Sequence, residues 1–61
     1  MTKKQIVEEL AKRMVYYNDE YEYWLKKAES QPENTGLIRA VEFCYGKATA
    51  YEDAYRLIKG A

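Results

Sequence analysis

The sequence contains no histidine, one cysteine, one proline and three glycines among its 61 residues. Without histidine, the chain has no imidazole for a nucleophilic triad, a metal ligand or acid–base catalysis, which excludes most classes of enzyme. The single cysteine, Cys44, has no partner for an internal disulfide, and we interpret it as a small core residue in a reducing compartment. The isolated glycines form no phosphate-binding loop. We therefore predict a non-enzymatic protein without a metal or a cofactor.

The sequence also lacks an excess of charge of either sign and long apolar runs. Ten Lys and Arg residues balance ten Asp and Glu residues, so no overall field attracts the chain to DNA, RNA or an anionic membrane. The N-terminus, MTKKQIVEEL, lacks the apolar core of a signal peptide. With 48% hydrophobic and 33% charged residues, the composition is typical of a folded protein. We expect a soluble cytoplasmic protein with no membrane partner.

The first half of the chain carries an apolar seam whose members are spaced alternately three and four residues apart, which predicts an amphipathic helix. Its members are Val7, Leu10, Met14, Tyr17, Tyr21, Trp24 and Ala28. Thr2 and Gln5 match a capping box, so we expect the helix to run from residue 3 to about residue 30. Pro32 disfavours helix at the residue before it, and Asn34 or Thr35 can cap a second helix.

The second half repeats this spacing and predicts a helix over residues 36–59, after a loop at 31–35. The second seam consists of Leu37, Val41, Cys44, Ala48, Tyr51, Tyr55 and Ile58. A loop this short makes the two helices antiparallel neighbours, so the expected fold is all-α, a single helical-hairpin domain over residues 1–61. The expected partners across the seam are Trp24 with Val41, Tyr21 with Cys44, Tyr17 with Ala48, and Met14 with Tyr51.

A second row of residues, here called the apolar stripe, lies on the flank of the second helix beside its seam. The apolar stripe consists of Ala40, Phe43, Lys47, Ala50, Ala54 and Leu57. A two-helix hairpin cannot cover both the seam and the stripe, and a helix with so much apolar surface belongs inside a bundle. We therefore predict a homo-oligomer, a dimer or higher. A symmetric dimer that packs the second helix of one copy against that of the other would form a four-helix bundle. Its expected interface consists of Ala40, Phe43, Ala50, Ala54 and Leu57.

Two residues of the second helix leave alternatives open. Lys47 lies among apolar neighbours, where two copies facing each other would repel unless a carboxylate or a bound anion lies between them. Alternatively, its stem covers apolar surface and its ammonium reaches water. Gly46 falls inside the helix, and it indicates either the close approach of another backbone or ligand, or a tolerated exposed glycine.

Two tyrosines of the first helix, Tyr16 and Tyr23, lie off the seam and share a face with Arg13 and Lys27. We call these four residues the tyrosine–cation flank. Tyrosine and arginine are enriched in protein-binding hot spots, and a ring beside cations also suits a nucleotide, whose base stacks while its phosphate meets the charge. The alternative is that these are surface tyrosines or further oligomer packing.

The C-terminal segment YGKATAYEDAYRLI, after a charged first helix and a Pro/Asn turn, resembles the ends of small helical-hairpin accessory proteins of tailed phages and prophages. The resemblance implies a protein that acts on host machinery in the host cytoplasm, and it transfers no residue roles. In size, class and Tyr/Lys content the chain is also similar to anti-CBASS sponges, small helical phage oligomers that sequester cyclic nucleotides between subunits.

The leading hypothesis from the sequence is therefore an oligomeric binding protein that neutralises a host defence by sequestering a nucleotide signal. The ligand-binding residues that it predicts are Arg13, Tyr16, Tyr23, Lys27 and Lys47. Two alternatives remain open, an inhibitor that docks onto a host protein and a purely structural helical-bundle module.

Overall fold

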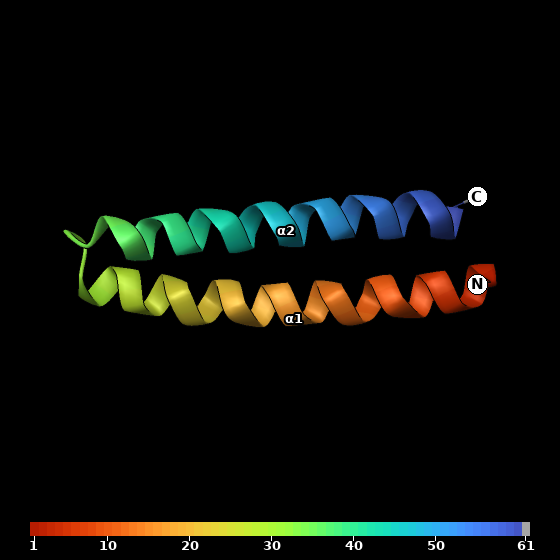
Figure 1. The fold of residues 1–61 in the computed structure, drawn as a ribbon, viewed down its shortest axis with the longest axis horizontal. Coiled ribbons are helices and arrows are strands. Elements are labelled where there is room, and N and C mark those ends of the chain that lie inside the picture. Colours follow the sequence, from red (N-terminus) through yellow and green to blue (C-terminus); the bar gives the residue numbers. More distant parts are fainter. Residues whose placement is uncertain (61) are drawn as a thin grey trace.

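The computed structural model describes residues 1–60 and consists of two α-helices joined by a short turn (Figure 1). Helix α1 spans Lys3–Ser30 and helix α2 spans Thr35–Gly60. The helices run antiparallel and side by side over their whole length, so the start of α1 and the end of α2 lie together (Figure 1). The molecule is a rod of 44 × 14 × 14 Å. The predicted all-α antiparallel hairpin is confirmed.

The ends of α1 are set by local hydrogen bonds. The backbone N–H of Thr2 donates to Gln5 Oε1 over 2.8 Å, and the N–H of Gln5 donates back to Thr2 Oγ1 over 3.2 Å. This reciprocal pair is the predicted capping box, and it satisfies two N–H groups that the first turn leaves free. At the other end, the N–H of Gln31 donates to the carbonyls of Lys27 and Ala28, and Pro32 follows without an N–H of its own.

The start of α2 is capped by Asn34, one of the two candidates that the sequence offers. Asn34 Oδ1 accepts a hydrogen bond from the N–H of Leu37 over 3.3 Å, while Thr35 is already helical. An Asn side chain in this position satisfies a free N–H of the first turn. The turn between the helices is therefore only four residues long, from 31 to 34.

The core of the hairpin is small. Within residues 1–60 only Cys44 and Ala48 are buried, with 5% and 8% of their surfaces exposed, and every other predicted seam residue is half-buried. The accessible surface of the chain is 4766 Å², roughly 15% more than the approximately 4,100 Å² typical of a compact monomer of this mass. The seam is thus confirmed, but the hairpin alone leaves much apolar surface in water.

Aromatic rings fill the middle of the seam. Tyr17 and Tyr51 stack across the two helices, with ring centroids 5.5 Å apart and an interplanar angle of 11°. Tyr21 and Tyr45 also meet across the seam, at 5.7 Å and 51°. The sequence predicts that Tyr51 faces Met14, but in the structure the Tyr51 ring packs on Tyr17, one turn further along α1. A long aromatic side chain reaches neighbours a turn away from the residue level with its own backbone.

Candidate interaction surface

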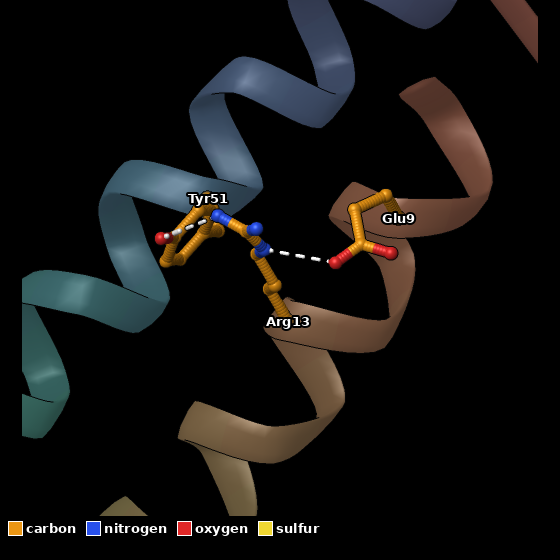
Figure 2. A network of polar contacts seen from close by, with 3 residues as sticks. All are labelled: Glu9, Arg13 and Tyr51. Atoms are coloured by element: carbon orange, nitrogen blue, oxygen red, sulfur yellow. Dashed lines mark hydrogen bonds and ion pairs between the residues drawn. The ribbon is translucent and has the colours of Figure 1, made fainter. Parts of the chain in front are cut away.

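Arg13 links the two helices at the edge of the seam (Figure 2). Its Nη1 donates to Tyr51 Oη over 3.2 Å, and its Nε donates to Glu9 Oε1 over 3.1 Å. The guanidinium carbon also lies 5.5 Å from the centroid of the Tyr51 ring. The hydrogen bonds to Tyr51 and then Glu9 raise the pKa of Arg13 above its usual value. Arg13 is therefore held in place by Glu9 and Tyr51, and its side chain is still exposed.

Tyr16 and Tyr23 each pack against the ring of the next residue and remain exposed. Tyr16 makes an edge-to-face contact with Tyr17 at 5.0 Å and 86°, and Tyr23 makes the same contact with Trp24 at 5.1 Å and 83°. Trp24 Nε1 in turn donates to Glu20 Oε2 over 3.0 Å. Both off-seam tyrosines are exposed in the hairpin, and each packs against the half-buried aromatic residue that follows it.

Lys27 lies close to two of these rings. Its Nζ is 4.7 Å from the centroid of Tyr23 and 5.6 Å from that of Trp24, which are cation–π distances. A shallow hollow of about 450 Å³ adjoins this group, and it is lined by Asp19, Glu22, Tyr23, Lys26 and Lys27. Two carboxylates thus stand beside the two lysines, so the hollow combines an aromatic face with balanced charge.

The five predicted ligand-binding residues are brought together only in part. Tyr23 and Lys27 form one group, and Arg13 lies by Tyr51. Two helical turns, about 10 Å, separate Tyr16 from Tyr23 along α1. Lys47 belongs to α2, where its Nζ lies 5.6 Å from the centroid of Phe43. The structure therefore presents these residues along an extended surface rather than around a single enclosed pocket.

The apolar stripe of α2 is open to solvent in the isolated hairpin. Phe43 and Leu57 expose 59% and 75% of their surfaces, and Lys47 and Ala50 are exposed between them. The Lys47 side chain lies along Phe43, so its stem covers apolar surface. Beside the stripe, a Cβ built onto Gly46 meets nothing within 4 Å. Nothing within the hairpin approaches Gly46 closely.

The tyrosine–cation flank of α1 and the apolar stripe of α2 lie on the same side of the hairpin. Arg13 reaches Tyr51, and Tyr51 is a one-turn neighbour of both Lys47 and Ala54 on α2. The pKa of Cys44, which lies one turn before Lys47, is raised by burial and then by the negative charge of Glu20 on α1. The two surfaces that the sequence indicates separately are therefore parts of one face.

The opposite side of the hairpin holds a groove that sequence reasoning missed. It has a volume of about 300 Å³ and is lined by Asn18, Tyr21, Tyr45, Ala48, Thr49, Glu52, Asp53 and Arg56. An ion pair between Arg56 and Glu52 spans one turn of α2 at this edge, and Tyr45 is exposed. The seven-residue spacing of Ile38, Tyr45 and Glu52 is the signal that marks this flank in the sequence.

Comparisons with known proteins add no assignment, since no protein-family model, curated protein or solved structure matches this chain. In the part of the chain that the structure describes, no three His, Cys, Asp or Glu side chains gather into a metal-binding group. Neither helix of residues 1–60 is long and apolar enough to cross a bilayer. The functional argument therefore depends on the exposed surfaces described above.

Proposed function

We propose that this chain is a non-enzymatic binding protein that acts as a homo-oligomeric helical bundle. One observation carries the proposal: among residues 1–60 only Cys44 and Ala48 are buried, while Phe43 and Leu57 of the stripe remain in water. A chain of this size has little stability to spare. Covering the stripe with another helical surface removes this apolar area from water, and the gain is about 25 cal/mol for each Å² buried.

Sedimentation equilibrium and urea unfolding of the purified chain test the assembly. An oligomer is expected, and its unfolding midpoint should rise with protein concentration because association stabilises the folded state. Phe43→Ser should lower the free energy of unfolding by about 2 to 4 kcal/mol if the ring is covered. Val15→Ser is the matched control, since Val15 is 61% exposed against 59% for Phe43 and belongs to the other helix.

The control should change the free energy of unfolding by less than about 0.5 kcal/mol, as expected for an exposed site. A folded monomer at every concentration, with Phe43→Ser indistinguishable from Val15→Ser, would contradict the proposal. That result would mean that water, and not protein, covers the stripe.

A second candidate function is the sequestration of a nucleotide signal of host defence, and Tyr23 with Lys27 favours it. The Tyr23 ring is half exposed with the Lys27 ammonium 4.7 Å from its centroid, so a base could stack there beside a cation. Asp19 and Glu22 line the same hollow, and their negative charges would repel the phosphate of a bound nucleotide. This candidate therefore depends on further cations from a second subunit.

Calorimetry with linear and cyclic nucleotides tests this candidate. Stacking contributes about 1 to 3 kcal/mol per base, so Tyr23→Ala should weaken binding by roughly tenfold or more. Tyr45→Ala, on the opposite side of the hairpin, is the control and should leave binding unchanged. If no nucleotide releases heat or shifts the melting temperature, sequestration is rejected and the bundle proposal stands on its own test.

A further inference from the structure

We propose that the occupant of the apolar stripe is a second copy of this chain, packed antiparallel across a two-fold axis level with residues 48 and 49. This inference rests on the oligomer of the proposed function, and it adds the partner's orientation and register. It is carried by two independent observations: the sizes of the exposed residues on α2, and the order of charges on α1.

The sizes of the stripe residues complement one another in the antiparallel arrangement. With seam-type packing, the two-fold axis places Ala40 opposite the partner's Leu57 and Phe43 opposite the partner's Ala54. Lys47 then lies opposite the partner's Ala50. Every large side chain faces a small one, which is how closely packed helices fill the space between them. A parallel pair would instead set each residue against itself, with Phe43 on Phe43 and lysine on lysine.

Lys47 is accommodated by the same arrangement. A small alanine opposite leaves room for the lysine stem, and the ammonium can extend toward the rim of the interface. Glu20 lies seven residues after Arg13 on the same flank of α1 and accepts a hydrogen bond from Trp24 Nε1 over 3.0 Å, so a carboxylate stands on this side of the hairpin. Glu20 is the counter-charge that two lysines near a two-fold axis require.

The charges on α1 complement one another in the same sense. Because the flank and the stripe share one side, the axis that pairs the α2 helices also places α1 beside the partner's α1. The contacts of Arg13 with Tyr51 and of Tyr21 with Tyr45 put the axis near residues 16 and 17 of α1. Arg13 then faces the partner's Glu20, and Glu9 comes within reach of the partner's Lys27.

A parallel pair would instead be related by a two-fold axis that runs along the helices, which places α1 and the partner's α1 on opposite sides of the two α2 helices. The antiparallel order thus gives attraction at four positions of α1 that do not meet their partners in the parallel order. Size on one helix and charge on the other favour the same orientation.

Disulfide cross-linking distinguishes the two orientations. In a Cys44→Ala background, Ala40→Cys and Leu57→Cys proteins of different mass are mixed and oxidised. In the antiparallel dimer, the Ala40→Cys position of one copy lies level with the Leu57→Cys position of the other. The two Leu57→Cys positions of the same dimer lie about 25 Å apart along the helix direction, too far for a disulfide. We expect the mixed species to cross-link at least tenfold more than either protein with itself, and Ala50→Cys, near the axis, to cross-link with itself.

Each other outcome has a separate meaning. Self-cross-linking of Leu57→Cys would show a parallel pair, and an oligomer without any of these cross-links would place its interface elsewhere. Both results overturn the inference and leave the oligomeric binding protein intact. A chain that sediments as a folded monomer overturns the proposed function itself.

Charge exchange tests the α1 contact separately. Arg13→Glu alone and Glu20→Arg alone should each weaken dimerisation by roughly 3- to 10-fold, since each creates two repulsive pairs across the axis. The double exchange should restore the affinity to within about threefold of the original protein. Lys12→Glu, an exposed neighbour outside the flank, is the control. If the double exchange is weaker than both single variants, the proposed register is wrong.

Discussion

Arg13 Nη1 donates a hydrogen bond to Tyr51 Oη over 3.2 Å (Figure 2), and the Tyr51 ring stacks on Tyr17 with the ring centroids 5.5 Å apart. Among residues 1–60, this is the only side-chain hydrogen bond that joins α1 to α2. Tyr51 therefore contributes in two separable ways. Its hydroxyl accepts an exposed, charge-assisted bond, while its half-buried ring packs in the seam.

The two contributions of Tyr51 predict different effects of two substitutions. Tyr51→Phe keeps the ring on Tyr17 and removes only a solvent-screened bond, so the free energy of unfolding should be nearly unchanged. Tyr51→Ala removes the ring as well and should lower the free energy of unfolding by about 2 to 4 kcal/mol. Urea unfolding followed by circular dichroism measures both. A Tyr51→Phe protein as unstable as Tyr51→Ala would mean that the hydroxyl, and not the ring, holds the helices together.

Trp24 is the only tryptophan of the chain, and it is both a seam residue and a probe. Trp24→Ala should cost about 3 kcal/mol because a large half-buried side chain is lost. Trp24→Phe retains most of the ring and loses the hydrogen bond from Nε1 to Glu20, so it should cost only about 1 kcal/mol. Circular dichroism at several urea concentrations measures the difference. If Trp24→Ala melts like the original protein, Trp24 is not part of the core.

The helices and their seam were predictable because they depend on local spacing. The alternation of three and four residues from Val7 to Ala28 marks the buried side of α1, and the Thr2 and Gln5 pair marks its start. Both features concern neighbours one turn apart, for which helical geometry is the same in every protein. Their prediction requires no knowledge of the second helix.

The contacts between individual side chains of the two helices were not predictable from the same spacing. That Arg13 reaches Tyr51, and that Tyr45 lies on the other side facing Tyr21, depends on how the long side chains interlock. Periodicity identifies which residues share a flank, but it does not say which side-chain atoms meet across the seam. The hydrogen bond from Arg13 to Tyr51 and the stacking of Tyr51 on Tyr17 therefore appear only in the structure.

Cys44 should react slowly with thiol reagents in the folded protein. Its thiol is buried, and burial, followed by the charge of Glu20, raises its pKa above the usual value. At pH 8 both access and the thiolate fraction are reduced, so Ellman's reagent should modify Cys44 at least tenfold more slowly than in denaturant. Rapid modification of the folded chain would show that the seam opens readily at Cys44.

The same shift gives a sign for the pH dependence of stability. Because folding raises the pKa of Cys44, the folded chain holds this proton more tightly, and its contribution is complete below the ordinary cysteine pKa of about 8.5. The contribution is lost as the pH rises from that value through the raised pKa. Urea midpoints from pH 7 to 9.5 should therefore fall more steeply than those of Cys44→Ala, and equal slopes would contradict the shift.

Gly46 distinguishes an open helix surface from a close contact with another backbone. A Cβ at this position meets nothing within 4 Å in the hairpin, and glycine inside a helix costs up to about 1 kcal/mol relative to alanine. Gly46→Ala should therefore raise the free energy of unfolding by about 0.5 to 1 kcal/mol. It should leave the oligomer intact, because the proposed axis puts Ala50 and not Gly46 at the centre of the interface. Gly60→Ala, at the last residue of α2, is the control and should gain less, since helix ends fray. A destabilised or dissociated Gly46→Ala protein would show that a second backbone lies against Gly46, which would move the interface from the apolar stripe to the neighbouring edge of α2.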